Sequence, residues 1–143
     1  MNTVQLDVVS SEDSLFSGQV AFVVIPTEMG EIGVYPKHEP LLGRVRPGVL
    51  RIKQDDRSEE ILLAVSGGVV EIQPDCITVL SEIALRSDEL DEQQAQKAKE
   101  EAEKMLAREA QDGVPGSASA EARLAAAIAQ LKAVEYIRQR ERR

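Results

Sequence analysis

The chain has 143 residues, of which 43% are apolar and 29% are charged, and this balance excludes bulk disorder and collagen-like structure. A net charge of -8 disfavours general nucleic-acid binding, because the phosphate backbone would be repelled. No stretch reaches the roughly 18 to 20 apolar residues that span a bilayer, and no basic-then-apolar leader opens the chain, so we expect a cytoplasmic protein.

Composition changes sharply near Arg86. Residues 1–86 hold thirteen Val and seven Ile, whereas residues 87–143 hold only two of each but thirteen Ala. Branched side chains favour sheet and alanine favours helix. We therefore predict an α+β fold, with a β part at residues 1–86 and an α part at residues 87–143.

Short strands separated by turn residues are predicted throughout the first part. Alternation places Val4, Leu6 and Val8 on one face of the first strand. Ser17 and Gly18 predict a turn before the second strand. Strands are expected at residues 3–9, 19–25, 31–35, 49–53, 60–65, 69–73 and 76–80. Because no helical crossover interrupts them, the pattern indicates a sandwich or barrel rather than a parallel α/β sheet.

Two helices are predicted in the second part. Asp88 can cap the first helix, which should end near Asp112 and Gly113, and Ser119 can cap the second. A short connection makes the helices antiparallel neighbours. The apolar stripe of the second helix is expected at Leu124, Ala127, Ile128, Leu131 and Val134. Since this seam is thin, we expect the hairpin to lean on another part of the molecule.

Residues for catalysis or metal binding are scarce. His38 is the only histidine and Cys76 the only cysteine, so multi-histidine and multi-cysteine metal sites and an internal disulfide are excluded. Residues 66–68, Ser-Gly-Gly, lack the lysine of a phosphate loop and predict a hairpin corner that needs positive φ. We expect no catalytic residue, no metal and no cofactor.

Residues 30–42 are the most informative segment. Two prolines fix an irregular loop there. Leu41 and Leu42 either re-enter the core or join a rim that presents Glu31 and His38 to a partner.

Residues 138–143 form a basic segment with four arginines and one glutamate. Basic residues at a helix C-terminus interact favourably with the helix dipole, which accounts for part of this pattern. The remainder predicts a tip that docks on an acidic surface.

Residues 30–42, Gly-Glu-Ile-Gly-Val-Tyr-Pro-Lys-His-Glu-Pro-Leu-Leu, closely resemble a segment of the epsilon chain of bacterial F-type ATP synthases. Further matching stretches lie, in order, at residues 6–10, 16–18, 66–72, 79–80, 90–92 and 125–131. The resemblance covers nearly the whole chain. It implies an N-terminal antiparallel β-sandwich followed by a C-terminal antiparallel two-helix hairpin.

The same resemblance implies a non-catalytic subunit of the central rotor stalk. Members of the family bind the gamma subunit and stand on the ring of membrane c subunits, whose proton-driven rotation they help to carry to the catalytic head. By position, Glu31 and His38 would face the c ring, and Ser10 and Leu42 would face gamma. The implied location is the cytoplasmic face of the bacterial inner membrane, where partners hold the protein peripherally.

The resemblance also implies regulation by the hairpin. In the family the hairpin folds against the sandwich or extends along gamma into the head, where it inhibits ATP hydrolysis. A weak alanine seam suits an element with two packings of similar energy. In the extended state, basic side chains would meet acidic segments of the alpha and beta subunits. These side chains are Arg123, Lys132, Arg138, Arg140, Arg142 and Arg143.

Some relatives bind ATP on the folded hairpin through a Leu/Ile-Asp-x-x-Arg-Ala motif. Here Asp91 fits that motif, but Gln94 stands in place of its arginine, and a neutral amide cannot neutralise a phosphate. Arg123 is the candidate to substitute for the missing charge. An ATP-sensing hairpin and an unrelated sandwich adaptor or small enzyme are the alternative functions.

Overall fold

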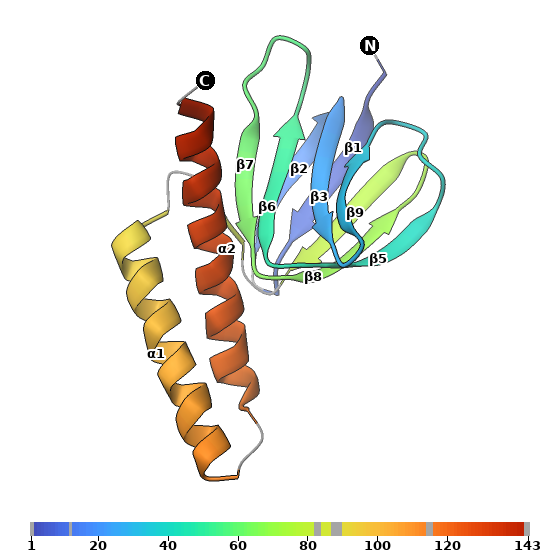
Figure 1. The fold of residues 1–143 in the computed structure, drawn as a ribbon. Helices are drawn as coiled ribbons and strands as arrows, with labels where there is room; N and C mark the ends of the chain where they lie inside the picture. The colour runs from blue at the N-terminus through green and yellow to red at the C-terminus, as the bar shows by residue number, and fades with distance from the viewer. Residues whose placement is uncertain (1, 12, 82–83, 87–89, 114–115, 142–143) are drawn as a thin grey trace.

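The computed structural model describes residues 2–11, 13–81, 84–86, 90–113 and 116–141. Within these ranges, ten strands are followed by two helices (Figure 1). The strands are β1 Val4–Val9, β2 Ser14–Val20, β3 Phe22–Thr27, β4 Gly30–Val34, β5 Leu41–Val45, β6 Gly48–Lys53, β7 Ile61–Val65, β8 Gly68–Ile72, β9 Cys76–Ser81 and β10 Ala84–Arg86. The helices are α1 Glu92–Gln111 and α2 Ala118–Glu141.

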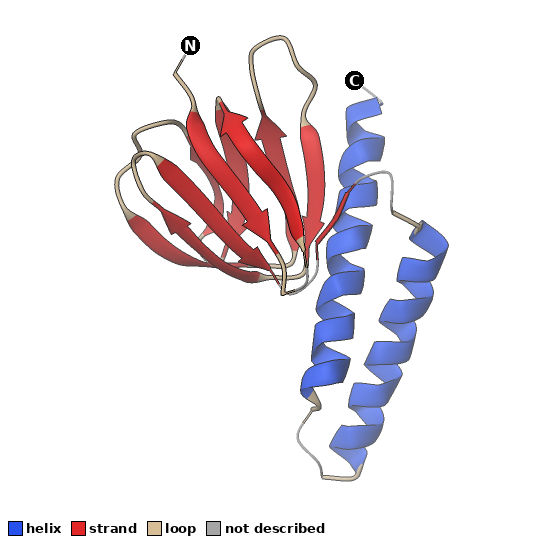
Figure 2. Ribbon diagram, turned by 180° about the vertical axis from the view of Figure 1, so that it is seen from behind, coloured by secondary structure: helices blue, strands red, loops and turns tan. Residues whose placement is uncertain are grey.

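The strands form two layers that are joined at one point. One layer contains β4, β3, β6, β7 and β10, and the other contains β5, β8, β9, β1 and β2. Thr27 of β3 pairs with Val45 of β5, and this pair links the layers. The layers face each other across a common core, as Figure 2 shows, and the predicted β-sandwich is confirmed.

One strand pair departs from the predicted antiparallel arrangement. β1 runs parallel to β9, with Gln5 opposite Cys76 and Val9 opposite Leu80. The other described pairs are antiparallel. Parallel neighbours need a long connection between them, and here the strands from β2 to β8 provide it.

The core lies between the layers. Val4, Leu6 and Val8 are all buried on one face of β1, as their alternation predicts. The largest fully buried side chains include Leu6, Ile25, Leu50, Ile52, Leu63, Ile72 and Ile77. The positive φ predicted for residues 67 and 68 is confirmed, with values of 113° and 148°. The predicted hairpin is wrong, because β7 and β8 do not pair and this corner carries the chain from one layer to the other.

Some local predictions in the β part are wrong. The strand expected at residues 19–25 is divided at Ala21 between β2 and β3. Ser17 and Gly18 do not form a turn but lie within β2, where they pair with Asp7 and Leu6. Pairing with β1, reinforced by a 2.7 Å hydrogen bond from the Ser17 hydroxyl to Asp7, overrides the local turn preference. Of the two leucines expected to return to the core, only Leu41 packs against it, whereas Leu42 is exposed. Neighbouring residues on a strand point to opposite faces.

The helix ends follow capping chemistry. The Asp91 carboxylate accepts a 3.1 Å hydrogen bond from the backbone N–H of Gln94 and caps α1, while the predicted cap Asp88 lies outside the described residues. α1 ends before Gly113, whose φ is 70°. The Ser117 hydroxyl accepts from the backbone of residue 120 and caps α2, so the prediction of Ser119 as the cap is wrong.

The hairpin is docked on the sandwich. α2 lies between α1 and the outer face of β6 and β7 in both ribbon views (Figures 1 and 2). Ala129 and Ala133 of α2 pack against Ala64 of β7, so the expectation that the hairpin leans on another element is confirmed. Both alanines lie outside the predicted apolar stripe, and α2 therefore has a second apolar face. Within the described residues, neither helix is long and apolar enough to cross a membrane.

Candidate interaction surfaces

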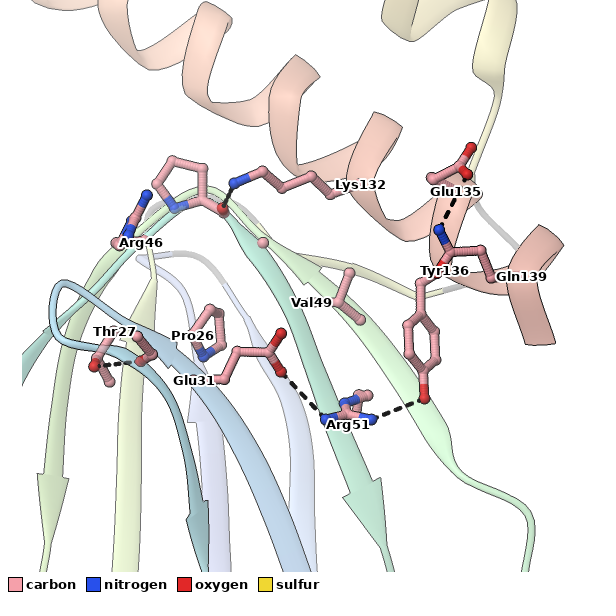
Figure 3. A pocket seen from close by; sticks show the side chains of 13 residues that line it. Pro26, Thr27, Glu31, Arg46, Val49, Arg51, Lys132, Glu135, Tyr136 and Gln139 are labelled. Atoms are coloured by element: carbon pink, nitrogen blue, oxygen red, sulfur yellow. Dashed lines mark hydrogen bonds and ion pairs between the residues drawn. The ribbon is translucent and has the colours of Figure 1, made fainter.

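A cluster of four side chains joins the hairpin to the sandwich, and Figure 3 shows three of them, Glu31, Arg51 and Tyr136. We call Arg51 of β6, Glu31 of β4, Tyr136 of α2 and Glu60, which precedes β7, the Arg51 cluster. Arg51 Nη1 donates to the Tyr136 hydroxyl at 3.0 Å, and that hydroxyl donates to Glu60 Oε2 at 2.9 Å. Arg51 Nη2 donates to Glu31 Oε2 at 3.2 Å.

Arg51 is held by complementary charge and by an aromatic ring. Its guanidinium carbon lies 5.1 Å from the centre of the Tyr136 ring, which is cation–π geometry. Partial burial works against the charged guanidinium, but the hydrogen bond to Tyr136 and the nearby carboxylates outweigh it and raise the pKa of Arg51 above its ordinary value. The cation is therefore permanent, and its bonds to the hairpin do not depend on pH near neutrality.

A hollow of about 390 Å³ lies beside the cluster, between α2 and strands β3, β4 and β6. At its rim, Lys132 Nζ donates to the backbone oxygen of Pro47 at 3.0 Å. This bond is a second polar link between α2 and the sandwich.

The outer face of the other layer carries exposed apolar side chains. Leu42 of β5, Val69 of β8 and Leu80 of β9 have exposed fractions of 71%, 42% and 54%. Val69 pairs with Leu80, so these strands place apolar side chains next to one another. Met29 lies beside them, at a hollow of about 450 Å³ that Leu42 and Val69 also line. We call these four residues the open face, because both helices lie on the β6–β7 side of the molecule (Figures 1 and 2).

The structure separates Glu31 from His38. Glu31 lies next to the β3–β4 turn, whereas His38 follows the other end of β4, where the backbone N–H of Lys37 donates to Pro74. β4 alone puts about 10 Å between Glu31 and that end. His38 Nδ1 lies 2.7 Å from the carbonyl oxygen of Glu39, to which it donates. Glu31 and His38 therefore do not form one compact site, and the prediction that both face a single partner stays a prediction.

Ser10 and Leu42 belong to the same layer. Ser10 follows β1 and its side chain is used locally, since its hydroxyl accepts a 3.1 Å hydrogen bond from the backbone N–H of Asp13. Leu42 points outward from β5 at the open face. β8 and β9 lie between β5 and β1, so both residues can contribute to one extended surface.

The basic residues of α2 are divided among several environments. Arg123 is exposed, Lys132 bonds the sandwich, and Arg138 forms an ion pair with Glu92 of α1. The side chain of Arg140 lies outside the described part of the chain. Arg142 and Arg143 also lie outside the described residues.

The three residues considered for ATP do not come together. Asp91 is occupied as the cap of α1, and Gln94 is exposed in its first turn. Arg138 of α2 pairs with Glu92 at the start of α1, close to Gln94. Arg123 lies about 22 Å further along α2, toward the other end of the hairpin. Arg123 therefore cannot supply the missing charge at Gln94, and that expectation is wrong. Among the described residues, no group of three or more His, Cys, Asp or Glu side chains is placed to hold a metal.

Sequence reasoning missed the Arg51 cluster and most of the open face. Alternation in residues 69–73 and 76–80 could have placed Val69 and Leu80 on outward faces. Their adjacency depends on the register of β8 against β9, which no local pattern gives. Arg51 and Tyr136 are 85 positions apart in the chain, and neither carries a motif.

The chain matches the same family over both of its parts. Residues 3–87 match the family described as "ATP synthase, Delta/Epsilon chain, beta-sandwich domain". Residues 88–135 match the one described as "ATP synthase, Delta/Epsilon chain, long alpha-helix domain".

Curated relatives match along nearly their whole length. The chain is 49% identical over 140 residues to the ATP synthase epsilon chain of Laribacter hongkongensis (strain HLHK9), covering 98% of this chain and 99% of that one. It is also 49% identical over 138 residues to the ATP synthase epsilon chain of Neisseria meningitidis serogroup C / serotype 2a (strain FAM18), covering 96% and 97%.

Among solved structures, the fold is similar to a chain in the cryo-electron microscopy structure of the Euglena gracilis mitochondrial ATP synthase, OSCP/F1/c-ring in rotational state 1. The TM-score is 0.68, and the match covers 94% of this chain and 81% of that chain. At 20% identity this likeness shows the fold alone.

Proposed function

The chain belongs to the family of ATP synthase delta/epsilon chains and is a component of that complex rather than an enzyme by itself, and we propose that it works in the central rotor stalk. In this role it binds the gamma subunit, stands on the c ring and helps to carry the torque of proton-driven rotation to the catalytic head. Its place is the cytoplasmic face of the bacterial inner membrane, where its partners hold it.

The open face is the observation that carries this proposal. Leu42, Val69 and Leu80 are large apolar side chains that a subunit working alone would leave in water. Gamma is the partner that the family offers for this surface, and burial of the three side chains would supply a hydrophobic centre for the contact.

We assign the contact with the c ring to Glu31 and not to His38. Glu31 lies at the β3–β4 end of the sandwich with its carboxylate exposed, and it can pair with basic side chains of the ring. His38 lies at the opposite end of β4, where a partner that meets Glu31 across a flat surface would not reach it.

The docked hairpin supports a regulatory role for the α part. Its contact with the sandwich consists of small alanine side chains and a few polar bonds, which suits a reversible element. Lys132 and Arg138 are occupied within the molecule in this state. Extension would free both cations, together with the exposed Arg123, for acidic segments of the alpha and beta subunits in the head.

Truncation tests this proposal. Membranes carrying a chain that ends after Arg86 should assemble the synthase and pump protons, yet hydrolyse ATP several-fold faster than membranes with the full chain. A chain that ends after Gln139 keeps almost the whole hairpin but lacks three arginines, and it should fall between the two. ATP hydrolysis that does not change in the first variant would refute the hairpin as a brake, and loss of assembly in the second would refute a purely regulatory tail.

A further inference from the structure

We propose that Arg51, Tyr136 and Glu60 form a polar latch that holds the hairpin on the sandwich, and that Glu31 sets the strength of this latch. The inference rests on the proposed function in one respect only, namely that hairpin release is regulatory. The latch itself is a property of the isolated chain.

The apolar part of the docking contact is small. Ala64, Ala129 and Ala133 form its buried centre, with Val49 and Leu90 partly buried around it. Alanine side chains bury little apolar area, so they stabilise the docked state only modestly. Directed polar bonds therefore contribute a large share of the difference between the docked and released states.

The latch supplies such bonds across the contact. The hydroxyl of Tyr136 accepts from Arg51 and donates to Glu60, so both of its hydrogen-bonding roles are used by groups of the sandwich. Hydrogen bonds to charged groups are stronger than those between neutral groups. The ring of Tyr136 adds a cation–π contact with the same guanidinium.

Glu31 completes the charge balance of the latch. Its carboxylate accepts a hydrogen bond from Nη2 of Arg51, on the side away from Tyr136, and is itself largely exposed. With this carboxylate in place, covering Arg51 with the hairpin costs less, because the cation stays partly neutralised. A partner cation that binds Glu31 would take the carboxylate from Arg51 and weaken the latch. By thermodynamic reciprocity, hairpin release would then make Glu31 more available to that partner.

Thiol labelling of the full chain tests the latch without any other subunit. In a Cys76→Ser background, a cysteine introduced by Ala129→Cys is covered in the docked state and reacts with a disulfide reagent only when the hairpin leaves. The labelling rate therefore measures release even when the released state is rare.

Three variants should raise this rate to different degrees. Tyr136→Phe keeps the ring but removes both hydroxyl bonds, and it should raise the rate about threefold to tenfold. Arg51→Ala should raise it about tenfold or more. Glu31→Gln should raise it about twofold.

Two controls separate latch loss from general destabilisation. Tyr35→Phe makes the same chemical change on an exposed tyrosine of the sandwich, and it should leave the rate unchanged. A core reporter, Val70→Cys in the same Cys76→Ser background, should label equally slowly in all variants.

Equal rates for Tyr136→Phe and its parent would overturn the latch, and no effect of Glu31→Gln would overturn the role of Glu31. Faster labelling of both reporters together would also overturn the proposal, because Arg51 and Tyr136 would then support the sandwich itself. None of these readouts involves ATP hydrolysis, so the latch and the braking role can fail independently.

Discussion

The two outer faces of the sandwich are built for different kinds of contact. The β6–β7 face carries the small side chain of Ala64 and is covered by α2, whereas the open face carries Leu42 and Leu80 and is covered by neither of the two described helices. Small side chains let α2 approach the sheet closely but bury little apolar area, so the helix can be released from this face. Exposing large apolar side chains to water is unfavourable in free energy, so such a face favours a partner that stays bound. This difference supports our proposal that the open face holds a permanent partner and that the β6–β7 face holds the hairpin reversibly.

The largest effect should come from the corner that leads into β8 of the open face. In Gly68→Ala the added Cβ would clash with the backbone oxygen of Leu80, at a φ of 148°. We expect a loss of more than about 3 kcal/mol in the free energy of unfolding, measured by urea denaturation.

Gly113→Ala is the matched change in the hairpin, since its φ is 70° but, apart from its chain neighbours, no described residue lies within 4 Å of the added Cβ. It should cost only about 1 kcal/mol. Equal losses at the two glycines would mean that the sandwich and the hairpin do not differ in rigidity.

A charge on the open face should weaken partner binding strongly. Leu42→Asp places a carboxylate at the centre of the predicted contact with gamma, and affinity should fall by about 2 to 4 kcal/mol in a binding assay with purified gamma. Because Leu42 is exposed, the free chain should lose no more than about 0.5 kcal/mol of stability.

Met105→Asp introduces the same charge at an exposed apolar position of α1 and serves as the control. It should leave the affinity for gamma unchanged. If Met105→Asp weakened binding as much as Leu42→Asp, the open face would not be the specific contact.

A larger side chain on the covered face should release the hairpin. Ala133 is 1% exposed, so Ala133→Leu forces three extra carbon atoms into the contact, and we expect a cost of about 1 to 3 kcal/mol to the docked state. Thiol labelling at position 129 would measure it. The exposed Ala107→Leu on α1 is the control and should have no effect. A docked state that tolerated the added leucine would show that this face is looser than its alanines suggest.

The smallest effect concerns the loop between β6 and β7. The Ser58 hydroxyl donates to Asp55, as do the backbone N–H groups of Arg57 and Ser58, and these bonds lower the pKa of the Asp55 carboxyl. The stabilisation should be present above the ordinary aspartate pKa of about 3.9 and be lost as pH falls through the lowered value. Asp55→Asn should therefore melt slightly below the parent at pH 7, and the difference should disappear in acid. The thiol-labelling rate at position 129 should not change. A change would show that this loop takes part in the docking of the hairpin.

Local chemistry predicted much of the fold. The change of composition at Arg86 separated strands from helices, alternation located the buried side of β1, and the glycines at 67 and 68 marked a corner. The errors arose where distant pairing decides the outcome. Ser17 and Gly18 have turn preferences, but the ladder with β1 holds them extended.

The interaction surfaces were predictable only in part. Glu31 and Leu42 stood out because they lie in an unusual segment, and the structure places both on the surface. Their surroundings depend on contacts between distant segments: Arg51 meets Glu31 across β3, and Val69 meets Leu80 through strand register. A one-dimensional pattern carries no information about either.

The parallel pairing of β1 with β9 has a consequence for biosynthesis. β1 can join β2 soon after both leave the ribosome, but its other edge stays open until residues 76–81 have emerged. The sandwich therefore closes late and as one unit, and the helices are translated only after their docking surface is nearly complete. An arrest of translation before β9 should leave a nascent chain with an unpaired edge, which is the natural target for a chaperone.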